Sequence, residues 1–248
     1  MTDHVMTKGR APILDGRLSA ALALAENCSV FADIGADHGR LSAVMLLEDE
    51  HRYGLVADIS AQALAKAKTL IGRMGLAHRV TFAVSDGLDA LNALTDRTPD
   101  TVFILGMGGD TVSGILLRGA AQLHSAALIL GAQTDLPLVR RALCSNGYRI
   151  CSEVVASESN RDYVLIRAIP AAGEEPSYSE EEFLLGPKLL KTLPKNWLGL
   201  LERREQLLSK GIRAMRAAGL EKDKERLALF EREIVYVQRA LAKLRKDD

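Results

Sequence analysis

Residues 30–39 read Val30-Phe31-Ala32-Asp33-Ile34-Gly35-Ala36-Asp37-His38-Gly39, a short apolar segment that runs into a glycine turn. The next apolar segment ends on an acidic residue, Asp58. In a doubly wound α/β sheet, such a carboxylate holds the hydroxyls of a ribose, and the glycine turn lets the backbone approach the ligand closely. We therefore expect an open α/β sheet that binds a nucleotide-like ligand at the carboxyl ends of its strands.

Two later segments extend this pattern. Ser85-Asp86-Gly87 follows the third apolar segment, and Gly106-Met107-Gly108-Gly109 follows the fourth. Ligands of open α/β sheets bind outside the carboxyl ends of the strands, so these four strand ends predict one shared site. The predicted cofactor-binding residues are Asp33, Gly35, Asp37, Asp58, Ile59, Asp86, Gly87, Gly106, Met107, Gly108 and Gly109.

The glycine spacing distinguishes between two classes of cofactor. A dinucleotide site needs the pattern G-x-G-x-x-G, whereas Asp37 occupies the position of the second glycine here. Its carboxylate would face a pyrophosphate at close range, which is electrostatically unfavourable. S-adenosylmethionine contains adenine and ribose but no phosphate, and its methionine end carries an ammonium that attracts a carboxylate. We therefore predict S-adenosylmethionine as the cofactor.

Strands and helices alternate along the first part of the chain. A leading helix is predicted at 17–25, and Ser60 and Gly75 are predicted to cap the helix that follows the second strand. The predicted strands are 30–34, 53–57, 80–84, 101–105, 127–130, 148–156 and 162–169. The last two follow one another without a helix and predict an antiparallel hairpin. A nucleotide-binding sheet that closes in this way is typical of class I methyltransferases, so we predict a Rossmann-like α/β fold of that class.

The charge of the chain is unevenly distributed. The 248 residues are 48% hydrophobic and have a formal net charge of zero. Residues 1–185 contain 16 Lys and Arg against 23 Asp and Glu, whereas residues 186–248 contain 16 against nine. A basic tail favours binding to a phosphate polymer, because Lys and Arg release counterions from phosphates. No signal peptide or apolar run of membrane-spanning length is present, so we expect a soluble, cytoplasmic protein without membrane association.

Metal binding is not expected from the sequence. The three cysteines, Cys28, Cys144 and Cys151, form no C-x-x-C pair, so neither a zinc ribbon nor a disulfide framework is indicated. The histidines outside the glycine turn are scattered without ligand spacing, and we expect them at surface or cap positions. They are His4, His51, His78 and His124.

The end of the chain predicts a helical appendage. The expected domains are a cofactor-binding domain at 1–172 and a helical domain at 173–248, joined through Gly173-Glu174-Glu175-Pro176. Apolar residues recur in the last helix at the a and d spacing of a coiled coil, at Leu227, Phe230, Ile234, Val237, Leu241 and Leu244. A complementary stripe lies upstream at Trp197, Leu201, Leu208, Ile212 and Met215. A break at 217–219 separates the two, so we predict a C-terminal α-helical coiled-coil hairpin.

The charges of this hairpin have two interpretations. They solvate the outer face of a structural coiled coil, or they bind the phosphates of an RNA. On the second interpretation the predicted tRNA-binding residues are Arg203, Arg204, Lys210, Arg213 and Arg216.

Four motifs resemble those of the bacterial tRNA (adenine(22)-N1)-methyltransferase family, TrmK. They are residues 32–38 with Leu41, the turn at 106–109, Glu158 with Asn160 and Tyr163, and Gly186-Pro187 with Leu189 and Leu190. The resemblance covers nearly the whole chain. It implies a catalytic domain followed by a helical hairpin, S-adenosylmethionine as the cofactor, and methylation of N1 of adenine 22 in tRNA.

The chain departs from this family at two places. Gly131-Ala132-Gln133 stands where the family often has Gln-Pro-Asn, and Val164 replaces a Glu that commonly follows the family tyrosine. We expect both places to lie near the acceptor base. They therefore bear on the choice of adenine and not on methyl transfer itself.

Methylation at N1 of adenine requires alignment more than it requires a strong base. N1 carries an in-plane lone pair that can attack the sulfonium methyl, so the enzyme must align the reactants and stabilise the charge that develops on the purine. The candidate catalytic residues are Asp37, His38 and Tyr163. The alternatives are that Asp37 only binds the cofactor ammonium, that His38 only caps the following helix, and that Tyr163 belongs to the rim of the core.

The sequence also allows other functions. The chain could methylate another RNA or a small molecule, or it could be a non-catalytic RNA-binding or scaffold protein that retains the methyltransferase fold. The joint presence of Asp33, Gly35, Asp58 and Asp86 favours an active enzyme. The expected partner is tRNA, with no membrane and no metal, and the expected oligomeric state is a monomer or a weak homodimer.

Overall fold

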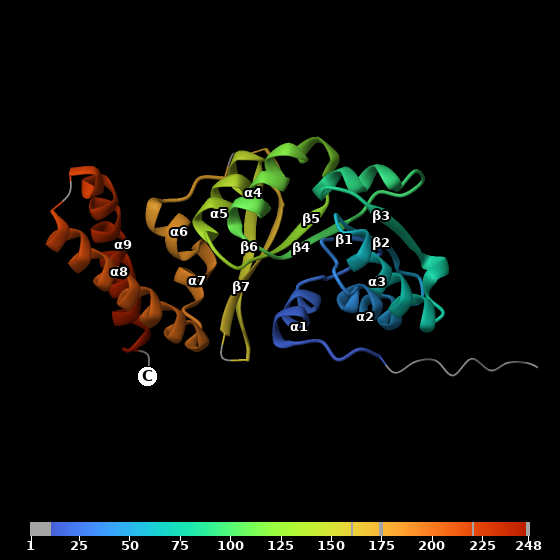
Figure 1. Ribbon diagram of the computed structural model, residues 1–248, viewed down its shortest axis with the longest axis horizontal. Helices are drawn as coiled ribbons and strands as arrows, with labels where there is room; N and C mark the ends of the chain where they lie inside the picture. The colour runs from blue at the N-terminus through green and yellow to red at the C-terminus, as the bar shows by residue number, and fades with distance from the viewer. Residues whose placement is uncertain (1–10, 160, 174–175, 220, 247–248) are drawn as a thin grey trace, which may run out of the picture.

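The computed structural model describes residues 11–159, 161–173, 176–219 and 221–246. His4, Asn160, Glu174 and Glu175, which belong to the sequence interpretation above, lie outside the described residues. The described part consists of an α/β sheet with helices on both faces, followed by a set of C-terminal helices beyond one edge of the sheet (Figure 1).

Within the described residues, seven strands form one sheet in the order β3-β2-β1-β4-β5-β7-β6. The strands are β1 (Val30–Ile34), β2 (Tyr53–Asp58), β3 (Val80–Val84), β4 (Thr101–Met107), β5 (Ala127–Ala132), β6 (Tyr148–Glu158) and β7 (Arg161–Pro170). The first five are parallel, and β7 runs antiparallel to both β5 and β6. The predicted methyltransferase sheet with its closing hairpin is therefore confirmed. β2, β4 and β5 extend past their predicted ends, because pairing continues into polar and glycine residues that sequence patterns assign to turns.

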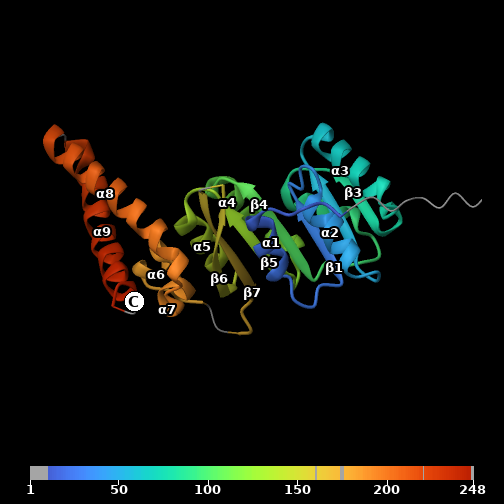
Figure 2. The same ribbon diagram turned by 90° about the horizontal axis from the view of Figure 1, so that it is seen from below.

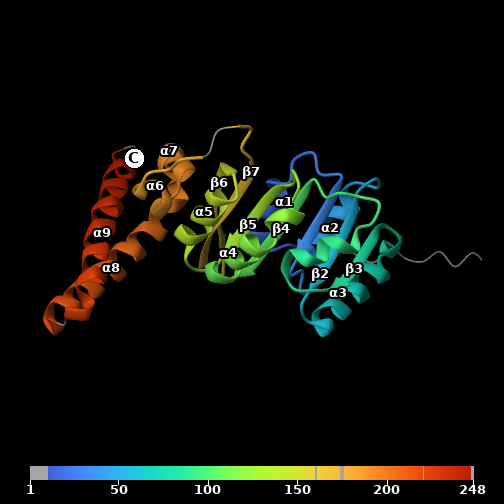
Figure 3. The ribbon, with the colours of Figure 1, turned by 90° about the horizontal axis from the view of Figure 1, so that it is seen from above.

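Helices cover both faces of this sheet. One face carries α1 (Gly16–Ala23), α2 (Arg40–Glu48) and α3 (Ala61–Arg73), and the other carries α4 (Gly109–Arg118) and α5 (Leu136–Ser145). Figures 2 and 3, seen from below and from above, show the two layers in turn. Successive strand residues point to opposite faces, so Phe31 packs under the first layer and Ala32 under the second. Burial on both faces explains the nearly continuous apolar runs of the parallel strands.

Local sequence determines where these helices begin and end. Asp15 caps α1 by accepting a hydrogen bond from the Leu18 amide at 2.8 Å, so the helix runs over 16–23 and not over the predicted 17–25. Ser60 caps α3, and Gly75 follows its end with a φ angle of +72°, which confirms both predicted caps. Short 3₁₀ turns lie at Ala77–Arg79, Gly87–Ala93, Ala120–Gln122, Lys195–Trp197 and Glu221–Asp223.

The C-terminal helices form a short pair and a long hairpin. They are α6 (Glu180–Leu185), α7 (Pro187–Thr192), α8 (Leu198–Ala218) and α9 (Lys224–Leu244). Gly219 ends α8 with a φ angle of +59°, as the predicted break requires. Val237, Leu241 and Leu244 of the predicted seam are buried, whereas Leu227, Phe230 and Ile234 are only half-buried. The difference follows from position, because the outer half of the hairpin projects away from the rest of the molecule (Figure 2).

A buried ion pair joins α6 and α7 to the sheet. Arg140 of α5 donates to Glu153 of β6 at 2.8 Å, and both side chains are almost completely buried. Arg140 also donates to the carbonyl oxygens of Phe183 and Leu184 at 2.9 and 3.0 Å, and Glu153 accepts from the Lys188 amide at 2.9 Å. The pair thus satisfies backbone groups at the end of α6 and the beginning of α7, where helix termini leave them unpaired.

The turn between α6 and α7 explains the Gly186-Pro187 motif. Gly186 has a φ angle of +105°, and a Cβ at this position would stand 2.6 Å from Glu153 Oε2. Pro187 begins α7, where a missing amide proton costs nothing. The apolar core is continuous across this junction, because it includes Leu189 and Trp197 together with residues of β5 and β7.

Candidate active site

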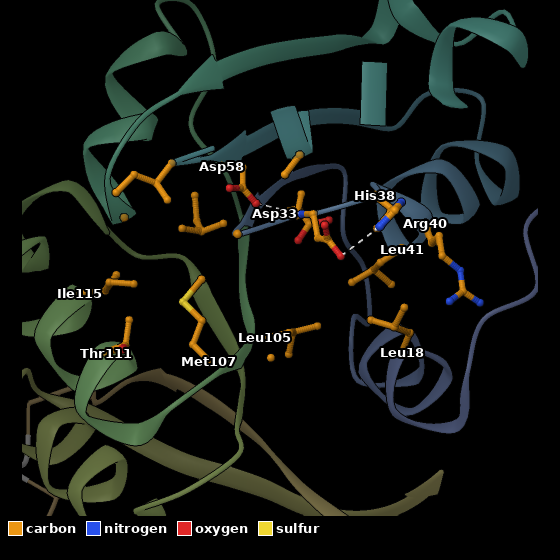
Figure 4. A pocket seen from close by; sticks show the side chains of 18 of the residues that line it. Leu18, Asp33, His38, Arg40, Leu41, Asp58, Leu105, Met107, Thr111 and Ile115 are labelled. Carbon is orange, nitrogen blue, oxygen red and sulfur yellow. Dashed lines mark hydrogen bonds and ion pairs between the residues drawn. The ribbon is translucent and has the colours of Figure 1, made fainter. Parts of the chain in front are cut away.

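A cavity of about 730 Å³ opens at the carboxyl ends of β1 to β4. Most of the residues predicted to bind the cofactor line it. These are Asp33, Gly35, Asp37, Asp58, Ile59, Asp86, Gly87, Gly106 and Met107, together with His38 from the catalytic candidates. Figure 4 shows Asp33 and Asp58 close together, with Leu105 and Met107 across the cavity from them.

Asp58 organises the glycine turn as well as facing the cavity. It is the last residue of β2, and its carboxylate accepts hydrogen bonds from the Asp37 amide at 3.0 Å and the Ser60 amide at 2.8 Å. An ionised carboxylate has about four acceptor positions, so about two remain for hydroxyl groups of a ligand. The side chain that the sequence assigns to a ribose therefore also fixes the backbone around it.

Asp33 lies at the floor of the cavity and is buried. It accepts a hydrogen bond from the Ser42 hydroxyl at 2.5 Å. Burial raises the pKa of Asp33 from 3.8 to about 6, with a further increase from the charge of Asp58, while Ser42 and the Arg17 guanidinium act in the opposite direction. A carboxylate held in this way gains from a cationic ligand group placed beside it.

The buried state of Asp33 predicts how the stability of the ligand-free protein depends on pH. Burial raises the pKa of Asp33 in the folded protein from 3.8 to about 6, so the protonated side chain stabilises the folded state relative to the unfolded one. This stabilisation is fully present below pH 3.8 and is lost as the pH rises through about 6. Asp33→Asn cannot ionise and is expected to lack this loss between about pH 4 and 6. Denaturant unfolding of both proteins across this range measures the difference. Parallel pH profiles of the two proteins would contradict the assignment.

Two glycines shape the cavity floor. Gly35 and Gly106 have φ angles of +75° and +80°, in the left-handed region that favours glycine. A Cβ on Gly35 would stand 2.1 Å from the methyl carbon of Met107, and a Cβ on Gly106 would stand 3.1 Å from a guanidinium nitrogen of Arg17. The Met107 side chain therefore lies directly against the backbone of Gly35, and the Arg17 side chain lies against the backbone of Gly106.

Gly108 and Gly109 lie next to the cavity but are absent from its lining. Gly109 is the first residue of α4, and a Cβ there would stand 2.5 Å from the Thr134 carbonyl oxygen. Gly108 has a φ angle of −68°, and a Cβ there would meet only the Thr134 hydroxyl at 3.5 Å. The structure therefore places Gly109 at a helix contact, whereas Gly108 has room for a side chain.

This contrast gives a matched pair of variants. Gly109→Ala is expected to lower the free energy of unfolding by about 1–3 kcal/mol, the usual cost of overpacking, because its Cβ meets backbone that cannot rotate away. Gly108→Ala is expected to unfold like the wild-type protein. Denaturant unfolding measures both, and equal stability of the two variants would show that the α4 contact does not restrict this position.

The catalytic candidates occupy different places. Asp37 and His38 lie at the rim, with 3.6 Å between Asp37 Oδ2 and His38 Nε2, and the Asp37 side chain is 67% exposed. Tyr163 does not line the cavity. Its ring in β7 instead lies 5.8 Å from the guanidinium carbon of Arg17. The structure thus brings Asp37 and His38 to the site directly and Tyr163 only through Arg17.

Several lining residues escaped the sequence interpretation. They are Asp15, Arg17, Leu18, Arg40, Ala63, Leu105, Thr111 and Ile115. Arg17 and Leu18 belong to α1, which the sequence presented only as an amphipathic helix. Gln133, which the departure from the family motif predicts to lie near the acceptor base, also lines the cavity.

The predicted tRNA-binding residues lie along α8, away from the cavity. Three of them form ion pairs within the protein: Arg203 with Asp162, Arg204 with Glu233 at 2.5 Å, and Arg216 with Glu231 at 2.6 Å. The Ser157 hydroxyl and the Arg203 guanidinium hold the pKa of Asp162 below its usual range. The pairs reduce the free charge of the hairpin.

Lys210 and Arg213 differ from these three. Both are exposed on α8, and neither forms an ion pair with the residues that the structure describes. They are therefore the members of the predicted set whose charge is most available to a ligand.

Two features are absent from the part of the chain that the structure describes. None of the helices there combines the length and the apolar character needed to cross a bilayer. In the same part of the chain, no group of three or more His, Cys, Asp or Glu side chains is arranged to hold a metal ion.

Comparison with known proteins gives matches over the α/β part and over nearly the whole chain. Residues 14–166 match the family described as a methyltransferase domain. A Mycoplasma pneumoniae protein named "Putative tRNA methyltransferase" is 31% identical over 182 residues, which cover 72% of this chain and 81% of that protein. The tRNA (adenine(22)-N(1))-methyltransferase of Bacillus subtilis is 26% identical over 223 residues, which cover 86% of this chain and 91% of that protein.

Solved structures agree with these matches. The crystal structure of the B. subtilis m1A22 tRNA methyltransferase TrmK superposes with a TM-score of 0.83 at 24% identity, covering 92% of this chain and 99% of that one. The structure of M. capricolum TrmK in complex with S-adenosylhomocysteine superposes with a TM-score of 0.79 at 23% identity, covering 93% and 99%. The similarity thus extends through the C-terminal helices.

Proposed function

Because the chain belongs to the methyltransferase domain family, we propose that it is a tRNA methyltransferase that uses S-adenosylmethionine to methylate N1 of adenine 22. The observation that carries the proposal is the order of side chains around the cavity. Asp86, Asp58, Asp33 and Gly106 stand at the ends of neighbouring strands, in the sheet order β3-β2-β1-β4. This arrangement suits a ligand with a nucleoside at one end and a cationic group at the other.

The charges of the cavity distinguish this cofactor from a dinucleotide. Asp33, Asp37, Asp58 and Asp86 all line the cavity, and a pyrophosphate among these carboxylates would be repelled. Ile59 is apolar and 71% exposed at the rim, where it can cover an adenine ring. Asp33 is placed to hold the ammonium of the methionine end, which gives its buried carboxylate a counter-charge.

When bound, the cofactor supplies an electrophilic methyl group on a sulfonium. The residues of the chain then orient the acceptor base and exclude water. Adenine N1 can attack without prior loss of a proton, so Asp37 and His38 at the rim serve to orient the base and to stabilise the positive charge that develops on it. Since N1 is engaged in pairing within a helical tRNA, the base must leave its stack before it reaches the cavity.

The hairpin of α8 and α9 is proposed to bind the tRNA backbone. Residues 186–248 carry the surplus of positive charge in the sequence, and Lys210 and Arg213 hold charge that is not neutralised within the described residues. Such contacts are independent of base sequence, so they position the tRNA while the cavity selects the nucleotide.

This role predicts a change in the salt dependence of tRNA binding. In Lys210→Glu/Arg213→Glu, the slope of log affinity against log salt is expected to flatten by about 0.7–0.9 for each phosphate that the variant no longer neutralises. Arg73→Glu is the control, because Arg73 is exposed at the end of α3, about 15 Å along the helix from the cavity residue Ala63. Fluorescence anisotropy at several salt concentrations measures the slopes. Equal slopes for the double variant and the wild-type protein would assign tRNA binding to another surface.

The proposed reaction is tested by transfer of a labelled methyl group. Unmodified tRNA transcripts with adenine or guanine at position 22 are incubated with the protein and labelled S-adenosylmethionine. We expect label in the adenine transcript and none above background in the guanine transcript. Equal labelling of both transcripts would assign the methyl group to a different nucleotide, and absence of label from both would contradict methylation of tRNA.

A further inference from the structure

We propose that Arg17 binds the carboxylate at the methionine end of the cofactor, and that Glu158 and Tyr163 hold Arg17 in position. The inference rests on the proposed function, because it assigns a contact inside the same cavity. It gives a role to an arginine in the leading helix and to two residues of the β6–β7 hairpin.

The beginning of α1 is fixed to the end of β6. Glu158 accepts a hydrogen bond from the Gly16 amide at 2.7 Å. The two segments are in close contact, since a Cβ on Gly16 would stand 2.3 Å from the Ser157 carbonyl oxygen. Arg17 is the next residue along the chain. The contact therefore fixes the point from which the Arg17 side chain reaches the cavity.

The guanidinium of Arg17 lies near both Tyr163 and Gly106. Its central carbon is 5.8 Å from the centroid of the Tyr163 ring, within the range of a cation–π interaction. One of its nitrogens stands 3.1 Å from the position that a Cβ of Gly106 would occupy. The tyrosine thus orients the guanidinium, and the glycine leaves room for it at the end of β4.

Arg17 differs from the other basic side chains of the cavity in forming no direct ion pair with the described residues, although its charge is near enough to that of Asp33 to lower the pKa of this carboxyl. Arg40 lies 3.8 Å from Asp15, and His38 lies 3.6 Å from Asp37. Arg17 forms no ion pair within the described part of the chain. A half-buried guanidinium that makes no direct bond to a carboxylate of the described residues favours an anionic ligand group, and its planar donors match a carboxylate in two parallel hydrogen bonds.

The order of the strands places the Arg17 guanidinium near the methionine end of the bound cofactor. The ends of β3, β2, β1 and β4 lie side by side. With the ribose held by Asp58 at β2, the methionine end extends across β1 to β4. Asp33 at β1 then faces the ammonium, and Arg17 above Gly106 at β4 faces the carboxylate, which is the one anionic group of the cofactor.

The test compares two ligands that differ only in this carboxylate. Isothermal titration calorimetry measures binding of S-adenosylhomocysteine and of its decarboxylated form, which keeps the amine. Arg17→Gln is expected to bind S-adenosylhomocysteine about tenfold or more weakly than the wild-type protein, the scale of one charge-assisted hydrogen bond. It is expected to bind the decarboxylated form within about twofold of the wild-type affinity. Arg17→Lys keeps the charge and is expected to show a smaller decrease.

Arg73→Gln is the matched control, and thermal unfolding verifies that each variant is folded. No loss of S-adenosylhomocysteine binding in Arg17→Gln, or an equal loss for both ligands, would overturn the inference. If the wild-type protein bound neither ligand, the proposed function itself would be contradicted, and the inference with it.

Glu158 is tested as a positioning residue. Glu158→Ala removes the acceptor for the Gly16 amide and is expected to weaken binding of S-adenosylhomocysteine but not of its decarboxylated form. Glu158→Gln keeps an oxygen that can accept this hydrogen bond, so it is expected to restore the affinity. A loss in Glu158→Gln as large as that in Glu158→Ala would show that Glu158 does not act through this hydrogen bond.

Discussion

Arg140→Met is expected to lower the free energy of unfolding by about 3–5 kcal/mol, because it leaves the Glu153 carboxylate buried without its charge partner. The two side chains are 1% and 0% exposed, and 2.8 Å separates their interacting atoms. The change also removes the donor from the carbonyl oxygens of Phe183 and Leu184 at the end of α6. Denaturant unfolding followed by circular dichroism measures the difference in stability.

The neighbouring arginine provides the control. Arg141 is 45% exposed and pairs with Glu180 at the surface, so Arg141→Met is expected to cost less than about 1 kcal/mol. In Arg140→Met/Glu153→Leu both charges are absent, and this double variant is expected to be more stable than Arg140→Met alone. If Arg140→Met were as stable as the wild-type protein, the ion pair could not be what attaches α6 and α7 to the sheet.

Asp58→Ala is expected to weaken binding of S-adenosylhomocysteine by more than about 100-fold, or roughly 3 kcal/mol, because it removes the acceptor of two charge-assisted hydrogen bonds from the ribose. The weakening has a second source. Asp58 also accepts from the Asp37 and Ser60 amides, so its removal loosens the glycine turn that borders the cavity. Isothermal titration calorimetry measures the affinity.

Two further variants separate these causes. Asp58→Asn keeps one acceptor oxygen for the turn but removes the charge, so its decrease in affinity is expected to be smaller than that of Asp58→Ala and still measurable. Asp96→Ala is the control, because Asp96 is exposed and outside the cavity. Unchanged affinity in a folded Asp58→Ala protein would remove Asp58 from the binding site.

The sheet and most of the cavity lining could be predicted because their signals are local in sequence. Apolar runs identify the buried parallel strands, and the residues just after each run must lie at its carboxyl end. Once the strands are assigned correctly, a single site is therefore predicted to contain Asp33, Asp58, Asp86 and Gly106. Their position after β4 also predicts Gly108 and Gly109 in the site, but neither lines the cavity. Gly109 instead allows α4 to pack closely against the turn between β5 and α5.

The remaining features depend on contacts between distant segments, which no local pattern encodes. Arg17 belongs to α1, whose first residue, Gly16, donates a hydrogen bond to Glu158 at the far end of β6. The pairing of Arg204 with Glu233 follows from how α8 and α9 face each other. A count of charges along the hairpin therefore cannot distinguish arginines that form ion pairs within the protein from those that do not. The structure makes this distinction, because Arg204 is paired and Arg213 is not paired within the described residues.

The site of methylation is the central claim, and mass spectrometry tests it most directly. A tRNA transcript with adenine at position 22 is incubated with the protein and S-adenosylmethionine, digested with a base-specific nuclease, and analysed fragment by fragment. We expect one 1-methyladenosine, in the fragment that contains position 22, and none when Asp58→Ala replaces the wild-type protein. A methyl group on any other nucleotide, or an unmodified fragment after incubation with the wild-type protein, would contradict the account.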